Sequence, residues 1–395
     1  MLTPAQNELL TKVGPGTPAG EMLRRYWWPI AIGTDLKERP TLVRLLGEDL
    51  VLFRDGGGRV GLLAAQCSHR RANLCLGDID GDGLRCRYHG WKYSVDGTVL
   101  DIPGEPHQEK LTARIRHRAY AVVEHSGGIF AYLGPDPAPL LPQFDVMVGE
   151  GERRMRISGF SNSNWMQCVE NGMDPTHVSF AHRDALAGCE NFPERIEFEH
   201  TDHGMIHKTY RSGSAPNMSF YREHHLLMPG ISVTGAAQRR VRGANEASAV
   251  SGRWTVPIDD GESMMVNIFY KPSANTGIVV QTPQERPLFG RWSAMKVQPY
   301  KEYRGVEPMP LGYDIPASVP AQDATLLDSM GPVVDRENEF LVSGDAPIVA
   351  LRKIFLQAIE TVSAGGDPPG VFRQAACVPV PAHEREIIRA TAPAA

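Results

Sequence analysis

The sequence lacks the features that mark membrane, secreted and nucleic-acid-binding proteins. No run of apolar residues approaches the roughly 18 that cross a bilayer, and the first residues contain no basic segment followed by an apolar one, as a secretory signal would. Six cysteines in 395 residues are too few for a disulfide framework. The formal net charge of −5 argues against the basic domain that nucleic-acid binding normally requires. We therefore expect a cytoplasmic protein that binds no membrane and no nucleic acid.

Glycine and proline, in contrast, are abundant: the chain has 39 and 31 of them, about 18% of its residues against a usual value near 12%. This excess predicts many turns and a largely β architecture, and the length predicts about two or three domains. The stiff, proline-rich stretch 135–142 is the best domain boundary. Capping and turn patterns predict helices over residues 4–13, 18 to about 29, 161–184 and 320–330, and from residue 345 onwards.

Cysteine and histidine occur together in the pattern C-x-H-x16-C-x2-H, formed by Cys67, His69, Cys86 and His89. Each half places one thiolate and one imidazole on a tight loop, and loops at the tips of hairpins can bring the two halves together. A [2Fe–2S] cluster can then take both cysteines on one iron and both histidines on the other. The alternative is a structural zinc site, although zinc ligands are usually grouped as like pairs. The mixed halves therefore favour the iron–sulfur cluster.

A second group of potential metal ligands follows in the polar stretch that we expect to be helical. His177 and His182 lie five residues apart, which is about 140° of rotation around a regular helix. The two side chains can bind one metal only if the helix breaks or bulges between them. Asp174, which precedes Pro175, is a candidate N-cap for the turn that carries them. Two histidines and a carboxylate leave positions on an iron open for dioxygen and substrate; the alternative is a capped surface helix with incidental histidines.

Together, this first motif and the motif N-x-x-D-x-x-H-x4-H, from Asn171 to His182, resemble the oxygenase (α) subunit of Rieske non-haem iron ring-hydroxylating oxygenases. The resemblance covers nearly the whole chain. The segments most similar to the phthalate dioxygenase group are Gln6–Pro18, Arg24–Pro29, Gln322–Asp323 and Gly331–Arg336. The resemblance implies an α+β fold. Its parts would be N-terminal helices over residues 1–35, an all-β Rieske [2Fe–2S] domain over 36–145, and a helix-grip catalytic domain of antiparallel sheet and helices over 146–395.

The resemblance also implies the ligands of two cofactors, a Rieske [2Fe–2S] cluster and a mononuclear non-haem Fe(II). The cluster ligands are the two cysteines and two histidines of the first motif. His177 and His182 correspond to two iron ligands, and the third, an aspartate near the start of a helix, corresponds to Asp323. Asp328 and Asp335 are the alternatives for this third ligand, although Asp335 could instead cap a turn.

Two further residues take roles from the same resemblance. Asp174 matches an acid that joins an iron-ligand histidine of one subunit to a cluster-ligand histidine of its neighbour. A carboxylate between two imidazoles fixes both rings and can relay the effect of cluster reduction to the iron. Asn171 matches a polar residue near the iron. Both side chains are therefore expected to act in catalysis without being iron ligands.

An aromatic carboxylate as substrate would require a cation in an otherwise apolar pocket, preferably an arginine that donates two hydrogen bonds. Each arginine of this region can equally be a solvated side chain on a strand, and the pattern does not separate the two cases. The candidate residues are Arg211, Arg222, Arg239 and Arg240, with His224 and His225 as further polar contacts.

We therefore expect the terminal oxygenase of a multicomponent system, which uses dioxygen for cis-dihydroxylation of an aromatic carboxylate such as a phthalate. O-demethylation or monooxygenation of a methoxylated or aryl-ether acid is the alternative, because it uses the same ligands. A non-catalytic Rieske electron carrier is the remote alternative. NADH would supply electrons through a separate flavin and iron–sulfur reductase, because no G-x-G-x-x-G motif follows a predicted strand. The resemblance implies a homotrimer or a hexamer of stacked trimers.

Overall fold

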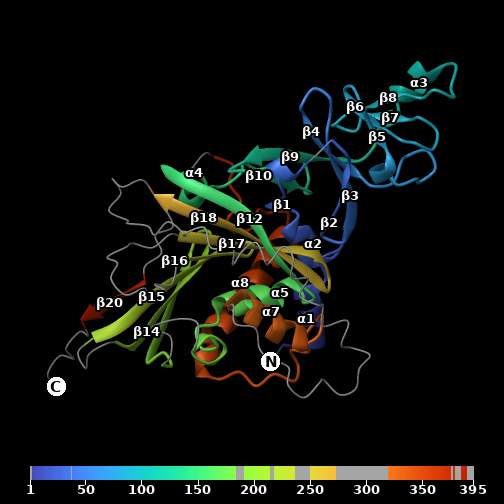
Figure 1. Cartoon of the computed structure of the whole chain (residues 1–395). Coiled ribbons are helices and arrows are strands. Elements are labelled where there is room, and N and C mark those ends of the chain that lie inside the picture. The colour runs from blue at the N-terminus through green and yellow to red at the C-terminus, as the bar shows by residue number, and fades with distance from the viewer. Residues whose placement is uncertain are drawn as a thin grey trace, which may run out of the picture.

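The computed structural model describes residues 2–36, 38–183, 191–213, 218–235, 250–272, 319–374, 377–378 and 384–388. Three antiparallel sheets and a group of helices occupy these ranges (Figure 1). None of the helices in the described ranges is long and apolar enough to span a bilayer. The helices are α1 (Pro4–Thr11), α2 (Pro18–Leu23), α3 (Gln108–Thr112), α4 (Asp145–Val148), α5 (Trp165–Met173), α6 (Val178–Ala181), α7 (Val319–Ser329) and α8 (Ala346–Ser363).

The first sheet has six strands in the order β1-β10-β9-β4-β3-β2. Its strand β1 was expected to continue a helix as far as Pro29, and that prediction is wrong. The helix α2 ends at Leu23, and the chain then pairs with β10. Pro29 is tolerated because β1 is an edge strand, so its missing N–H interrupts no central ladder. The strands are β1 (Trp27–Ile32), β2 (Thr41–Leu45), β3 (Glu48–Arg54), β4 (Val60–Ala64), β9 (Ala119–His125) and β10 (Gly128–Tyr132).

A small four-stranded sheet lies beyond the first sheet, at the end of the molecule farthest from β14 and β15 (Figure 1). A separate small core beneath it contains Phe53, Leu74, Leu84 and Tyr93. Short strands with tight turns place the intervening loops at the surface. The strands of this sheet are β5 (Asp78–Asp80), β6 (Gly83–Arg85), β7 (Lys92–Tyr93) and β8 (Val99–Asp101).

The largest sheet follows the proline-rich stretch 135–142 and has eight antiparallel strands. Seven of them run in the order β12-β18-β17-β16-β15-β14-β13, and β20 also pairs with β15. A two-stranded parallel pair, β11 (Gln143–Phe144) with β19 (Cys377–Val378), lies outside this sheet. The strands of the large sheet are β12 (Gly151–Ser161), β13 (Arg195–Thr201), β14 (Gly204–Ser212), β15 (Met218–Leu227), β16 (Ile231–Gly235), β17 (Val250–Asp259), β18 (Glu262–Pro272) and β20 (Glu384–Ile388).

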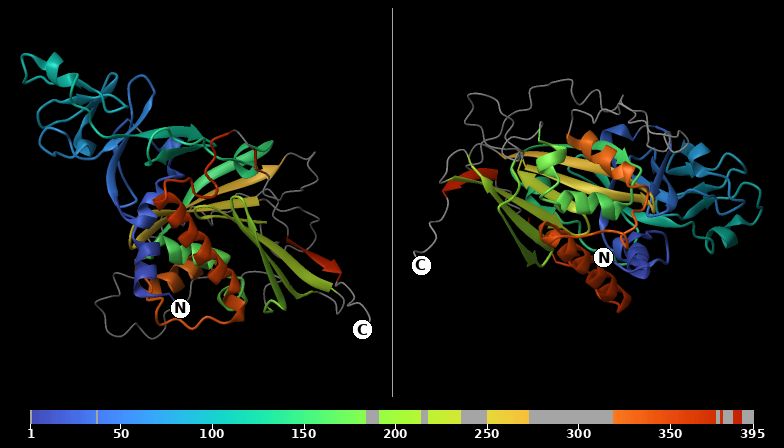
Figure 2. Two further views of the ribbon diagram at one scale, coloured as in Figure 1. Left: turned by 180° about the vertical axis from the view of Figure 1, so that it is seen from behind. Right: turned by 90° about the horizontal axis from the view of Figure 1, so that it is seen from below.

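The two faces of this large sheet have different partners. Helices α1, α5, α7 and α8 lie on one side of it, and β1, β9 and β10 of the first sheet lie on the other (Figures 1 and 2). The predicted last helix has an apolar stripe, in which Leu351 and Phe355 are fully buried, and Phe355 packs edge-on against Trp165 of α5. One continuous core therefore ties the N-terminal helices, the first sheet and the large sheet together.

The helix predicted over residues 161–184 forms as two pieces. The longer piece, α5, has the N-cap Asn164, whose side-chain oxygen accepts a hydrogen bond from the Met166 N–H. It ends at Met173, before Pro175, and the single turn α6 follows. Proline cannot continue the hydrogen-bond ladder of a helix and restricts the residue before it to extended backbone. The break therefore falls before the two histidines rather than between them.

Candidate active site

The cysteines and histidines of the first motif meet on two loops next to the four-stranded sheet. One loop follows β4 and the other joins β6 to β7, and each is closed by a backbone hydrogen bond from its cysteine N–H, 2.9 and 2.8 Å long. Cys67 and Cys86 are buried, whereas His69 and His89 are exposed. The two imidazole rings have their centroids 4.5 Å apart in an edge-to-face arrangement. Two buried sulfurs and two outer imidazoles thus face one small volume.

This donor set fits a [2Fe–2S] cluster of the Rieske kind, with thiolates on the inner iron and imidazoles on the outer one. Burial raises the pKa of the Cys86 thiol, and the nearby Cys67 raises it further, so a bound metal must supply the charge that ionises the pair. The Tyr93 hydroxyl lies 3.0 Å from Cys67 Sγ. Trp91 stacks on His69 with the ring centroids 5.0 Å apart. These aromatic groups shield the inner side of the site.

His177 and His182 are brought together by the short turn α6. His177 precedes this turn and His182 ends it, in a non-helical conformation, so the two rings lie 5.1 Å apart and nearly perpendicular. Asp323, near the start of α7, completes the group: its Oδ1 lies 2.9 Å from His182 Nε2 and 3.6 Å from His177 Nε2. Ligand atoms of the three residues all lie within 4.8 Å of one another. A two-histidine, one-carboxylate set of this geometry fits a mononuclear iron.

Neighbouring side chains orient both rings. His182 Nδ1–H donates to Gln322 Oε1 over 2.7 Å, which leaves Nε2 directed at Asp323. The buried Nδ1 of His177 makes no hydrogen bond within the described residues, but it faces Asp174 Oδ2 at 3.6 Å. Fixing one imidazole nitrogen in this way determines which nitrogen is available to a metal.

Asp174 also closes the turn that precedes α6, but the N-cap of α6 is His177, so the predicted N-cap is wrong. Its Oδ1 accepts hydrogen bonds from the N–H and hydroxyl of Thr176, both 2.7 Å long. Burial raises the pKa of Asp174, but the nearby His177 side chain and the hydrogen bonds from Thr176 lower it more, to about 2. Burial likewise raises the pKa of Asp323, but the two histidines and Arg253 hold it well below its usual range. Both carboxylates are therefore ionised.

The remaining acids and amides divide between the site and the scaffold. Asn171 belongs to the site, because its Nδ2 lies 3.3 Å from Asp323 Oδ1 and 3.4 Å from His177 Nε2. Asp328 is buried and accepts hydrogen bonds from three residues at the end of β12, so it anchors α7 to that strand. Asp335 is exposed and closes a turn through the Glu337 N–H and Asn338. The structure places Asp323 beside the histidines, and places neither alternative there.

A buried ion-pair network holds α5 against the C-terminal helices. Glu170, one residue before Asn171, accepts hydrogen bonds from Arg336 at 2.8 Å and Arg352 at 2.7 Å. Burial raises the pKa of Glu170, but the two arginines lower it more, so the net shift is downward. Such a network is rigid because Glu170 and the two arginines are already paired with one another.

A polar cavity of about 170 Å³ opens beside the proposed iron ligands. It lies between α5–α6 on one side and the large sheet on the other. Strand register explains its lining, because paired residues on neighbouring strands share a face: His207 pairs with His224, and Arg253 pairs with Ser232 and Asn267. The other strand residues that line it are Thr209, Arg211, Arg222, Thr234 and Ser251.

The arginines predicted for substrate binding have different surroundings. Arg211 is fully buried, and its guanidinium donates to the carbonyl oxygens of Pro175 and Asn191 and to Thr209. Its hydrogen bonds therefore hold the turn before His177, and it also lines the cavity, so its expected role as a substrate ligand stays a prediction. Arg222 does line the cavity. Arg239 and Arg240 lie outside the described residues. His224 lines the cavity, whereas His225, its neighbour in the strand, does not.

Two titratable residues of the cavity, Arg253 and His207, were not predicted from the sequence. The guanidinium of Arg253 lies 3.9 Å from Asp323 Oδ2, and His207 is 2% exposed on β14. Period-two alternation was the available signal. In β17, Ser251 and Arg253 alternate with Gly252 and Trp254, which places the two polar side chains on one face. The signal identifies the shared face, but only the fold shows that this face looks into the cavity.

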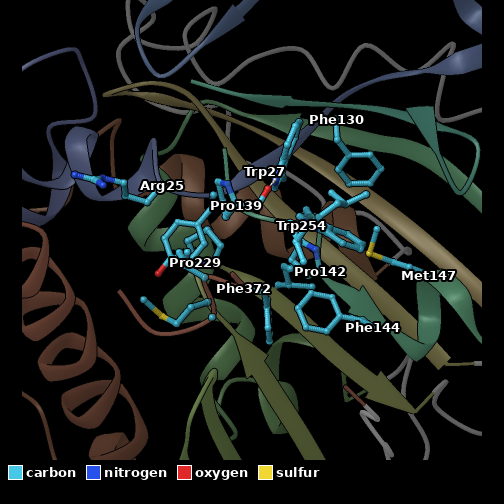
Figure 3. A pocket seen from close by; sticks show the side chains of 17 residues that line it. Arg25, Trp27, Phe130, Pro139, Pro142, Phe144, Met147, Pro229, Trp254 and Phe372 are labelled. Atoms are coloured by element: carbon cyan, nitrogen blue, oxygen red, sulfur yellow. Dashed lines mark hydrogen bonds between the residues drawn. The ribbon is translucent and has the colours of Figure 1, made fainter. Parts of the chain in front are cut away.

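A second, apolar cavity lies on the opposite face of the large sheet (Figure 3). Trp254 lines it, whereas its neighbour Arg253 lines the polar cavity. Phe130 of the first sheet and Phe372 of the C-terminal segment also border it. Its volume of about 20 Å³ accommodates about one water molecule, and the side chains labelled in Figure 3 are aromatic, proline, methionine and one arginine. This cavity is a packing feature between the sheets.

Fold and site together define an oxygenase of the Rieske class. Residues 26–125 match the family model described as the Rieske [2Fe–2S] domain. The chain is 35% identical over 384 residues to the phenoxybenzoate dioxygenase subunit alpha of Ectopseudomonas oleovorans, covering 92% of this chain and 87% of that one. It is 31% identical to the 5,5'-dehydrodivanillate O-demethylase oxygenase subunit of Sphingobium sp., covering 98% and 88%. The chain therefore belongs to the oxygenase (α) subunits of the Rieske non-haem iron ring-hydroxylating oxygenases.

The fold is shared with solved structures. NdmA of Pseudomonas putida CBB5, solved as the QL mutant with caffeine, superposes with a TM-score of 0.67 at 19% identity, covering 94% of this chain and 98% of that one. The predicted α+β fold, the enzyme class, the Rieske [2Fe–2S] cluster and the mononuclear non-haem iron are confirmed. The domain limits 1–35, 36–145 and 146–395 stay predictions; the family match and strand β1 both begin before residue 36.

Proposed function

We propose that this chain oxidises an aromatic carboxylate with dioxygen beside His177, His182 and Asp323. The observation that carries this proposal is the charge of the polar cavity. Three arginines line it, whereas Asp174 and Asp323 are the only acids among the described lining residues. The described lining therefore has more cationic than acidic side chains, and a positive potential of this kind attracts an anionic substrate. Aromatic acids combine that charge with a ring for oxidation.

The ligand assignments are part of the same proposal. Cys67 and Cys86 would hold one iron of the cluster, and His69 and His89 the other. His177, His182 and Asp323 would hold the mononuclear iron. When bound, the cluster supplies electrons one at a time and the mononuclear iron activates dioxygen. The geometry of both donor sets supports this assignment.

The surrounding residues position these groups and control protons. Gln322 accepts a hydrogen bond from the Nδ1–H of His182, and Asp174 faces Nδ1 of His177. Both rings therefore present Nε2 toward Asp323. Asn171 donates toward the Asp323 carboxylate and keeps it from rotating. Residues of α5 and α6 line one side of the cavity beside the proposed iron ligands.

Electron delivery would require other chains. A separate NADH-dependent flavin and iron–sulfur reductase would reduce the cluster. The exposed imidazoles of His69 and His89 form the edge at which electrons would enter and leave. In a homotrimer or a hexamer of stacked trimers, Asp174 would bridge His177 to the cluster histidine of a neighbouring subunit. The side chain of Asp174 is 26% exposed, which leaves it within reach of a second chain.

Product analysis tests the reaction. Iron-loaded protein would be incubated with NADH, a surrogate reductase and aromatic acids, including phenoxybenzoate, phthalates and methoxybenzoates. Mass spectrometry would then determine the masses of the products. A cis-diol gains both atoms of dioxygen and two hydrogens, with two electrons from one NADH. Oxygen consumption with peroxide formation and no product from any acid would overturn the aromatic-acid substrate class.

O-demethylation is the second candidate, because one relative bears the name of an O-demethylase. The same experiment separates the two reactions. A demethylase product loses CH₂ and releases formaldehyde, since the oxidised methyl group leaves after one oxygen atom is inserted. A non-catalytic electron carrier would give neither product and would hold no iron at His177, His182 and Asp323.

A further inference from the structure

His207 has an unusual position in the polar cavity. It lies on β14, is 2% exposed, and forms part of the cavity lining. Neither of its ring nitrogens has a hydrogen-bond partner within the described part of the chain. Its ring contacts that of His224, with the centroids 4.9 Å apart, but His224 Nε2 is already bonded to Ser232. Buried polar groups in native proteins are nearly always hydrogen-bonded. We therefore expect His207 to have a hydrogen-bond partner that is not one of the described residues.

The charges around His207 indicate what that partner is. Burial lowers the pKa of His207, and the cations Arg222 and Arg211 lower it further, to about 3. The ring is therefore neutral and carries one N–H donor. Asp174 acts on its pKa in the opposite direction. A positive potential at a neutral donor favours an anionic oxygen, since the donor stabilises the oxygen and the arginines compensate its charge.

Arg253 is the competing anchor for such an anion, and its surroundings weigh against it. Its guanidinium lies 3.9 Å from the ionised Asp323, so its charge already has a carboxylate partner. β14 and β17 are three strands apart in the sheet, which is roughly 14 Å. An anionic group held at β14 therefore leaves the rest of a substrate to extend along the sheet toward Asp323.

We propose that His207 donates a hydrogen bond to the carboxylate of the aromatic substrate, with Arg222 beside it as the counter-charge, and thereby determines specificity. This inference rests on the proposed aromatic-acid function and assigns the end of the cavity at which the acid group binds. His207 is a binding residue in this scheme and takes no part in oxygen chemistry. The ring carbons of the substrate would then face the proposed iron ligands.

Substrate binding tests this directly, without turnover. Full-length protein loaded with both cofactors would be titrated anaerobically, by calorimetry, with phenoxybenzoate and with diphenyl ether, which has the same rings and no carboxylate. If product analysis identifies a different acid, that acid and its carboxylate-free parent ring replace the pair. The variants are His207→Leu, His207→Gln, which keeps a donor, and His200→Leu. The control residue His200 is exposed on the neighbouring strand β13.

We expect His207→Leu to weaken binding of the acid by about 10-fold to 100-fold, the effect of a charge-assisted hydrogen bond. Binding of diphenyl ether should stay unchanged, His207→Gln should recover part of the loss, and His200→Leu should bind as the unaltered protein does. Cluster absorbance and iron content verify that each variant is loaded. Equal loss for both ligands, or no loss for the acid, would overturn the role of His207. If the unaltered protein binds no aromatic acid, the proposed function fails, and this inference fails with it.

Discussion

The two proposed metal sites of this chain differ in their exposure and in how they are built. The cysteine and histidine site lies on two short loops, and its outer ligands His69 and His89 are exposed. The other site is more buried: the side chains of His177, His182 and Asp323 are 20%, 1% and 11% exposed. Electrons can pass between proteins only through an accessible edge, whereas oxygen chemistry on a substrate requires water to be excluded. The difference in burial therefore follows the difference in task.

The supporting residues differ in the same way. Around the loops, backbone hydrogen bonds and aromatic rings provide the support, and Tyr93 reaches the inner sulfur. Around the more buried site, charged and amide side chains provide it, and Glu170 clamps the helix that leads into it. A buried site holding charged ligands must be satisfied by fixed dipoles and opposite charges, because water is absent. Changes to each set should therefore affect one site and spare the other.

The largest expected effect comes from removing one ligand. Asp323→Ala should empty the mononuclear site and leave the cluster, because two histidines alone hold iron weakly. Metal analysis should show iron falling from about three atoms per chain to about two, with oxygenation reduced by at least about 100-fold. Asp335→Ala is the control and should keep all its iron; loss of iron in Asp335→Ala instead would contradict the assignment.

A smaller effect is expected at Asp174, through which we propose that the two sites communicate. Asp174→Asn keeps an oxygen that can accept the Thr176 hydrogen bonds, but it removes the negative charge that faces His177. We expect both metals to be retained and turnover to fall by about 10-fold to 100-fold. The measurement is the rate at which the pre-reduced cluster is reoxidised in the presence of substrate and dioxygen. An unchanged rate of cluster reoxidation would contradict the proposed role of Asp174 as a bridge between the two sites.

Stability should respond to the clamp on α5. Glu170→Gln removes the carboxylate that pairs with the buried Arg336 and leaves Arg352 with Glu339 alone, so the free energy of unfolding at pH 7 should fall by about 3–5 kcal/mol. Urea unfolding of this variant, with the exposed Glu337→Gln as control, measures the difference.

The pH dependence of that difference has a defined sign. Because the folded-state pKa of Glu170 is below its ordinary value, its stabilisation is complete above the unfolded pKa of about 4.3. The stabilisation is lost as the pH falls through the folded-state pKa. The difference in the free energy of unfolding between Glu170→Gln and the unaltered protein should therefore become smaller below about pH 4. A difference that is constant with pH would indicate a packing effect and exclude the ion pair as its cause.

The smallest effect is expected at the exposed site. Tyr93→Phe removes the hydroxyl that lies 3.0 Å from Cys67 Sγ. A hydrogen bond to sulfur stabilises the reduced cluster, so its loss should lower the reduction potential. A bond of about 1.4 kcal/mol corresponds to about 59 mV for one electron. Spectroelectrochemical titration measures the shift, and Tyr120→Phe, whose hydroxyl bonds Glu48 instead, should show none.

Local chemistry in the sequence predicted much of the framework. The capping box at Thr3 and Gln6 forms as expected, and the apolar stripe of α8 is buried. The helix predicted as far as Pro29 was wrong, because pairing with β10 overrides the helical pattern. The surroundings of Arg211 could not be predicted from the sequence either. A buried arginine and a substrate-binding arginine look identical in sequence, because only the surrounding carbonyl groups distinguish them.

The sequence by itself determined the two motifs and the family they indicate, because the ligands within each motif are close in the chain and their spacing constrains their geometry. Tertiary structure alone decided how the rest assembles. Asp323 lies 152 positions from Asn171, yet their side chains are 3.3 Å apart. The cavity draws one to three residues from each of five neighbouring strands. Strand register and helix packing set such contacts, and they depend on burial across the whole chain rather than on any local pattern.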